Sequence, residues 1–140
     1  SIALGGARLA IQKAVEYAKE RKVFNDTPIG AHQAIAHPLA EIHMELEAAR
    51  LMTQKAAALL AAGDHMGAGE AANIAKYLAA EVSVKAVDQA VQTHGGNGLS
   101  REYGLVDMVT SARLGRIAPV SREMVLNFVA QFSLGLPKSY

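Results

Sequence analysis

The sequence contains no cysteine and no tryptophan, and aromatic residues make up only 5% of it. The lack of cysteine excludes a disulfide framework and cysteine-ligated metal sites. No uninterrupted apolar run reaches the roughly 18 residues that a membrane-spanning helix requires, so a membrane span is not expected. The formal net charge is only +1, and basic residues are interspersed with acidic ones. A nucleic-acid partner is therefore not expected, because phosphate-binding surfaces carry a concentrated basic face.

The residues that are present favour helices. The composition is 51% hydrophobic and rich in alanine, which has the highest intrinsic helix propensity and lets helices approach closely. A chain of 140 residues corresponds to one domain. We therefore predict a single all-α domain over residues 1–140, built as an antiparallel four-helix bundle of up-down topology with an additional short C-terminal helix.

Apolar residues recur at steps of three and four along most of the chain, which is the period of a buried helix face. This period predicts four helices, over residues 3–21, 31–62, 67–94 and 103–116. A last helix is expected to follow Ser121, a favourable N-cap residue. That helix carries more apolar residues than one face needs, which predicts self-association through Val125, Phe128, Val129 and Phe132.

The five histidines do not have the spacing of a metal site. His32, His37 and His43 are five and six residues apart, whereas paired metal ligands on a helix are four residues apart. No Glu-x-x-His pair recurs on two helices either. We therefore expect surface or hydrogen-bonded histidines and no metal.

Two short segments could hold a planar, phosphorylated ligand. Arg21 ends the first predicted helix, and Phe24 follows three residues later; a guanidinium can bind phosphate while an aromatic ring contacts a planar group. The second segment is Gly95-Gly96-Asn97-Gly98, with Gln92 one helical turn before it. Taken alone, each segment has an ordinary explanation, as a basic helix end or as a glycine C-cap.

In combination, these segments resemble the C-terminal domain of flavin-dependent acyl-CoA dehydrogenases. The resemblance covers essentially the whole chain and rests on residues 17–24 (YAKERKVF), 32–35 (HQAI), 88–98 (DQAVQTHGGNG) and 102–103 (EY). It implies a bundle that follows a helical N-terminal domain and a β-barrel middle domain, neither of which lies within these 140 residues. It also implies FAD bound between domains and subunits, with contacts from Arg21, Phe24, Gln33, Gln92, Gly95, Gly96 and Ser121.

The activity that the resemblance implies is α,β-dehydrogenation of an acyl-CoA thioester by a homo-oligomer (a dimer or tetramer). Electron-transfer flavoprotein or a similar acceptor would take up the electrons. The usual catalytic base is a glutamate just before the last helix, where this chain has Pro119. Some family members instead carry the base on the first helix of this domain, at a position expected a few residues before Ser1. Glu123 is a third candidate, but an acidic residue in the first turn of a helix has a simpler role as a capping charge.

The base therefore stays unassigned at this point, and two alternatives stay open: a non-catalytic partner subunit of the same fold, and a helical interaction module without flavin. The chain begins inside a predicted helix, so we expect a preceding N-terminal portion and no activity from these residues alone. The bacterial cytoplasm and the mitochondrial matrix both fit, and the sequence does not decide between them.

Overall fold

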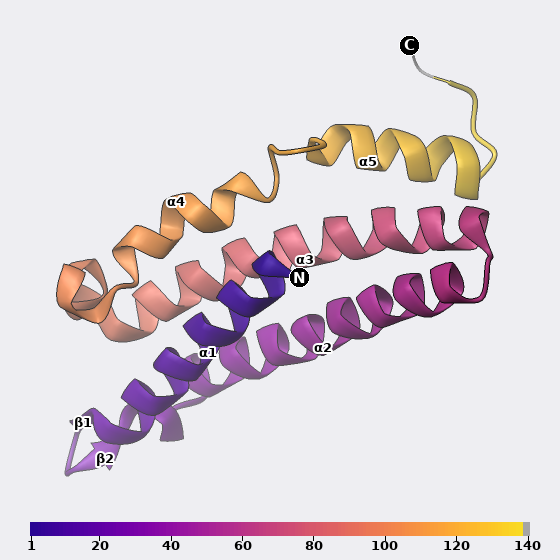
Figure 1. Ribbon diagram of the computed structural model, residues 1–140. Coiled ribbons are helices and arrows are strands. Elements are labelled where there is room, and N and C mark those ends of the chain that lie inside the picture. The colour runs from indigo at the N-terminus through magenta and orange to yellow at the C-terminus, as the bar shows by residue number, and fades with distance from the viewer. Residues whose placement is uncertain (139–140) are drawn as a thin grey trace.

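The computed structural model describes residues 1–138, and helices form nearly all of it (Figure 1). The five helices are α1 (Ile2–Glu20), α2 (Gln33–Ala61), α3 (His65–His94), α4 (Val106–Leu114) and α5 (Arg122–Phe128). One π-helical turn, Val129–Ser133, continues α5. The helices from α1 to α4 alternate in direction, and α5 continues in the direction of α4, so that α4 and α5 run one after the other along α3 (Figure 1). The predicted all-α, antiparallel bundle is confirmed. The short helix α5 follows α4 along α3, so the two together occupy the fourth position of the bundle.

The central helix of the bundle is α3, which contacts each of the other four helices. Its valines Val82 and Val87 are almost completely buried, so packing stabilises this helix although valine has a low intrinsic helix propensity. Small residues let the helices approach closely: the buried stripe of α1 consists of alanines and one isoleucine, namely Ala7, Ala10, Ile11, Ala14 and Ala18. Leu105, just before α4, has no exposed surface and joins the same core.

Helix ends depart from the predicted limits where local turns intervene. The fourth helix was expected from residue 103, but Gly104 adopts a left-handed φ of 70° and separates a short 3-10 turn from α4. The third helix begins two residues earlier than expected, because the Asp64 carboxylate accepts a hydrogen bond from the Gly67 N–H at 2.9 Å and caps it. The Ser121 hydroxyl caps α5 as predicted, accepting from the Met124 N–H at 3.3 Å.

A two-stranded hairpin between α1 and α2 was not predicted. Lys22–Val23 (β1) pairs antiparallel with Thr27–Pro28 (β2), and the strands are too short to show an alternating pattern. The turn consists of Phe24, Asn25 and Asp26, all with positive φ. Asn and Asp tolerate this conformation better than Phe does. The turn leaves the Phe24 side chain 81% exposed.

The apolar residues of the last helix are not all available for association. Val125 is only 1% exposed because it belongs to the chain's own core, so its predicted interface role is wrong. Phe132 is 61% exposed, and its ring lies 4.8 Å from that of Phe128. Besides Phe132, this segment exposes Met124, Leu126 and Leu134, so its exposed apolar surface consists largely of other residues than those predicted.

Candidate functional site

A polar cavity of about 460 Å³ lies where α3 ends against the end of α1. Its walls come from three segments distant in sequence, and nine residues line it: Tyr17, Arg21, Ile29, Gln92, Thr93, His94, Gly95, Gly96 and Asn97. Four of the residues expected to contact a cofactor lie here together, namely Arg21, Gln92, Gly95 and Gly96. The structure thus gathers the two segments that the sequence singled out separately.

Arg21 and Gln92 bring unpaired polar groups to this cavity. The main chain of Arg21 is fixed, because its N–H donates to Tyr17 O and its carbonyl accepts from Ile29 N–H, both at 2.8 Å. Its exposed guanidinium makes no hydrogen bond or ion pair with any residue in the described part of the chain. The same holds for the side-chain amide of Gln92. A free cation and a free amide therefore face a hollow where a ligand could bind both.

The three glycines of the turn after α3 have different structural roles. Gly95 has a φ of +59°, which other residues rarely adopt. A Cβ on Gly98 would lie 2.5 Å from the Val91 carbonyl oxygen, so close packing on α3 requires glycine there. A Cβ on Gly96 would meet nothing within 4 Å, and its φ is not positive. Nothing in the fold of this chain requires glycine at position 96, which leaves room for a ligand to approach the backbone.

A cluster of rings forms part of the cavity wall beside the glycine turn, and no sequence pattern predicted it. The His94 side chain is buried, its Nδ1 lies 2.7 Å from Ala90 O, and its ring stacks on Tyr17 at 4.2 Å. The Asn97 amide donates to the hydroxyls of Tyr17 at 3.0 Å and Tyr103 at 3.3 Å. These contacts tie the turn to α1 and so fix the distance between the turn and the end of α1, which carries Arg21.

The other predicted cofactor contacts lie outside this cavity. Phe24 projects from the hairpin, with its ring edge-on to His32 at 6.0 Å. Gln33 is exposed at the first position of α2. Ser121 is the N-cap of α5, at the end of the α4–α5 connection. These three residues do not line the cavity that Arg21 and Gln92 share.

The α4–α5 connection, which carries Pro119, borders a larger hollow of about 740 Å³. The hollow is walled mainly by alanines of α2, α3 and α4 and by the first three residues, Ser1, Ile2 and Ala3. Lys76 also lines it, and its ammonium donates to Gly115 O at 2.7 Å. Glu123 is exposed in the first turn of α5 and does not line this hollow.

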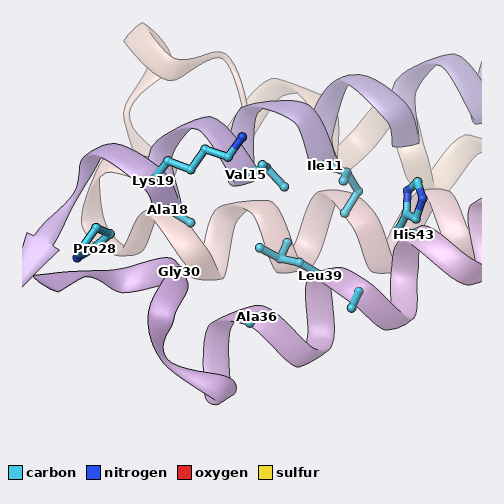
Figure 2. Close-up of a pocket in the computed structure, with 10 residues that line it drawn as sticks. Ile11, Val15, Ala18, Lys19, Pro28, Gly30, Ala36, Leu39 and His43 are labelled. Atoms are coloured by element: carbon cyan, nitrogen blue, oxygen red, sulfur yellow. The ribbon is translucent and has the colours of Figure 1, made fainter.

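The two hollows lie far apart along α3. Ala80 is the last α3 residue of the larger one and Gln92 the first of the smaller one, and these positions are 12 residues apart, which corresponds to about 18 Å of helix. A third hollow, of about 460 Å³, lies between α1 and α2 (Figure 2). Its walls are mainly apolar, with Lys19 and His43 among them, and none of the predicted site residues lines it.

Residues 1–138 offer neither a metal cluster nor a membrane span. No three His, Asp or Glu side chains gather there in a way that could hold a metal ion. No helix in this part of the chain is long and apolar enough to cross a bilayer.

Comparison with known proteins identifies the family. The family profile described as "Acyl-CoA dehydrogenase, C-terminal domain" matches residues 1–134. Acyl-CoA dehydrogenase FadE12 of Mycobacterium tuberculosis is 67% identical over 138 residues, which are 99% of this chain and 35% of that protein. The chain thus spans about a third of the length of the curated relatives that it matches.

Solved structures of longer proteins share the fold. The butyryl-CoA dehydrogenase of Megasphaera elsdenii superposes with a TM-score of 0.84 and 34% identity, over 95% of this chain and 33% of that one. The FAD complex of PigA gives a TM-score of 0.90 and 28% identity, over 96% of this chain and 34% of that one. The chain therefore belongs to the acyl-CoA dehydrogenase family and corresponds to the C-terminal domain of that family.

Proposed function

We propose that this chain is the C-terminal domain of an FAD-dependent acyl-CoA dehydrogenase, which introduces an α,β double bond into an acyl-CoA thioester. The observation that carries the proposal is the polar cavity at the end of α3, where Arg21, Gln92, Gly95 and Gly96 meet. In this role the domain supplies part of the FAD site and contacts between subunits.

The residues of the cavity fit a dinucleotide cofactor. A diphosphate binds well to a guanidinium that has no other anionic partner, and Arg21 is such a group. Gln92 has a free amide that can both donate and accept hydrogen bonds. The backbone at Gly96 has open space where a side chain would stand, so a phosphate or ribose can approach it closely. Arg21 and Gln92 would therefore hold the cofactor, with Gly95 and Gly96 forming the floor.

The proposed reaction needs a base as well as the cofactor. When bound, FAD would accept a hydride from the β-carbon of the thioester, and a protein carboxylate would remove the α-proton. Pro119 has no group that can accept a proton, and Glu123 lies outside the hollow that Pro119 borders. We place the base on the α1 side of this hollow, in the segment that precedes Ser1 in the full-length protein. Ser1 and Pro119 line the same hollow, which supports this placement.

The proposed enzyme is an oligomer. The α3 residues that line the two hollows are at least 12 positions apart, from Ala80 to Gln92, which is about 18 Å of helix, and we assign the hollows to two different FAD molecules. One subunit would present Ser121 and the Pro119 region to its own cofactor, and Arg21 and Gln92 to that of a neighbour. Electron-transfer flavoprotein or a similar protein would reoxidise the flavin. A non-catalytic partner subunit of the same fold is the second candidate, and Pro119 at the usual position of the base favours it.

The Gly96→Ala substitution in the full-length protein tests the cofactor site. We expect the affinity for FAD to fall about tenfold, which corresponds to about 1.4 kcal/mol, with an unchanged melting temperature of the FAD-free protein. The new Cβ meets nothing within 4 Å in this chain, so the fold of this domain should tolerate it, whereas a cofactor against the Gly96 backbone would have to move away. FAD titration of the apoprotein, followed by flavin fluorescence, measures the affinity.

The matched control is Gly98→Ala in the same turn. Its Cβ would lie 2.5 Å from the Val91 carbonyl oxygen, so this variant should lower the melting temperature of the FAD-free protein. Wild-type affinity for FAD in Gly96→Ala would contradict the assignment of the cavity to the cofactor.

A further inference from the structure

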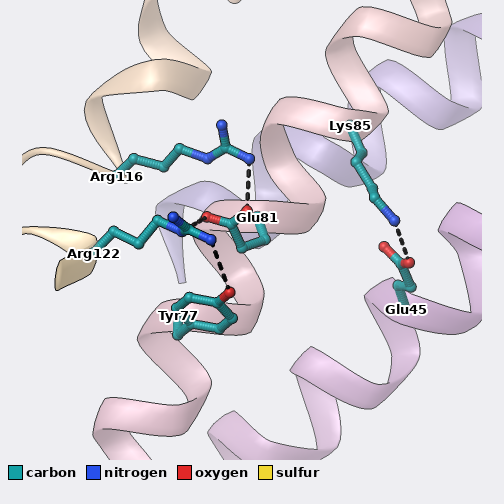
Figure 3. A network of polar contacts seen from close by, with 6 residues as sticks. All are labelled: Glu45, Tyr77, Glu81, Lys85, Arg116 and Arg122. Carbon is teal, nitrogen blue, oxygen red and sulfur yellow. Dashed lines mark hydrogen bonds and ion pairs between the residues drawn. The ribbon is translucent and has the colours of Figure 1, made fainter. Parts of the chain in front are cut away.

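The connection between α4 and α5 is closed at its base by two arginines that share one carboxylate of α3 (Figure 3). Arg116 Nη2 lies 2.6 Å from Glu81 Oε2, and Arg122 Nε lies 3.2 Å from Glu81 Oε1. The main-chain N–H of Arg122 also donates a hydrogen bond to the main-chain carbonyl of Arg116 at 2.9 Å. The two ends of the loop 116–122 are therefore joined to each other and to a single side chain of α3.

Two further residues of α3 hold the same loop. The Lys76 ammonium donates to the carbonyls of Gly115 and Val120, on the two sides of Pro119. The Tyr77 hydroxyl accepts a hydrogen bond from Arg122 Nη2 at 3.3 Å, and its ring lies 5.5 Å from the guanidinium carbon of Arg122. Polar groups of α3 thus contact the loop before, within and after its tip.

These polar contacts are the main attachment of the loop tip, because its own side chains are not buried. Ile117, Ala118, Pro119 and Val120 are all exposed, so apolar packing holds the tip only weakly. The side chains of Glu81 and Arg116 are 23% and 26% exposed, which makes their ion pair less screened by solvent than a surface pair. Removal of the Glu81 charge would leave two neighbouring guanidinium groups without their shared anion.

We propose that Glu81 is a positioning residue, which fixes the 116–122 loop and so places the wall of the hollow at Pro119 and the cap of α5 at Ser121. Lys76 assists by binding the loop backbone. The consequence for catalysis rests on the function proposed above, in which this hollow adjoins the reacting part of the substrate. Glu81 acts through the loop, since it does not line the hollow itself.

The test compares Glu81→Gln with Glu45→Gln in the full-length, FAD-bound protein. Glu45 also makes an ion pair to α3, with Lys85 at 2.5 Å, but this pair is more exposed and makes no contact with the loop (Figure 3). In Glu81→Gln we expect amide hydrogen exchange of residues 116–122 to accelerate at least tenfold, because the loop loses its anchor. Glu45→Gln should exchange in this segment as the wild type does.

The second readout is anaerobic flavin reduction by saturated acyl-CoA thioesters, from butyryl-CoA to palmitoyl-CoA. Displacement of groups around a reacting centre by about 1 Å can cost about 100-fold in rate. With the thioester that reduces the wild-type flavin fastest, we expect Glu81→Gln to lower the maximal rate by about 10- to 100-fold at unchanged FAD content. Arg116→Gln, which removes one arm of the network, should show a smaller loss of the same kind. Should Glu81→Gln fail to fold, Arg116→Gln provides both readouts.

The outcomes separate the two proposals. Unchanged exchange of residues 116–122 would overturn the positioning role, and so would flavin reduction equal to that of Glu45→Gln. If no thioester reduces the wild-type flavin, the proposed dehydrogenase activity fails, and the exchange measurement alone decides whether Glu81 positions the loop.

Discussion

Replacing Arg21 by glutamine in the full-length protein should lower its affinity for FAD by about 10- to 150-fold. Hydrogen bonds to a charged group typically contribute about 1.5–3 kcal/mol, and the Arg21 guanidinium has no competing partner in the described part of the chain. Its backbone is fixed by two hydrogen bonds of 2.8 Å, so glutamine should leave the end of α1 in place. Titration of the apoprotein with FAD, at several salt concentrations, measures the change.

Lys22→Gln is the matched control for Arg21→Gln. Lys22 is the adjacent cation, but its ammonium is paired with Asp26 at 2.8 Å on the hairpin, and it does not line the cavity. The Lys22→Gln variant should therefore retain nearly all of the wild-type affinity for FAD. Equal losses in the two variants would indicate a diffuse electrostatic effect and contradict a specific diphosphate contact.

The Leu105→Ala substitution should cost about 2–5 kcal/mol of unfolding free energy, the range for large-to-small changes in a core. Leu105 has no exposed surface and is among the largest fully buried side chains of the described residues. It enters the core immediately before α4, so the cavity that it leaves would loosen the attachment of α4 to the bundle. Denaturant titration of the full-length protein, followed by circular dichroism, measures the change.

Leu99→Ala serves as the control, because Leu99 is also a leucine, six positions before Leu105, but is 67% exposed. Its substitution should change the unfolding free energy by no more than about 0.5 kcal/mol. A loss for Leu105→Ala as small as that expected for the control, no more than about 0.5 kcal/mol, would mean that Leu105 is not a core residue in solution.

The first two helices, α1 and α2, were predictable because each buries one continuous stripe of residues. The steps of three and four in α1 correspond directly to its buried stripe, from Ala7 to Ala18. The limits of α4 were less predictable, since Gly104 adopts a left-handed conformation that separates a 3-10 turn from the helix, and the periodicity of apolar residues does not show such a break. The hairpin at Lys22–Val23 left no periodic signal, because two residues cannot show alternation.

The functional sites were predictable only as separate pieces. The sequence pointed to Arg21 and to the glycine turn, but only the fold shows that they share one cavity while Phe24 and Gln33 lie outside it. The Glu81 network could not be predicted, since Arg116 lies 35 positions from its partner. Such contacts depend on how α4 and α5 run along α3, which helix periodicity does not specify.

The most direct test of the central claim is a structure of the full-length protein with FAD bound. We expect the diphosphate to lie in the cavity at the end of α3, with a phosphate oxygen within hydrogen-bond distance of the Arg21 guanidinium and the cofactor against the backbone of Gly95 and Gly96. We also expect the flavin ring of this FAD to be bound by a different copy of the chain. An FAD molecule bound elsewhere, with this cavity filled only by solvent, would contradict the proposed cofactor site.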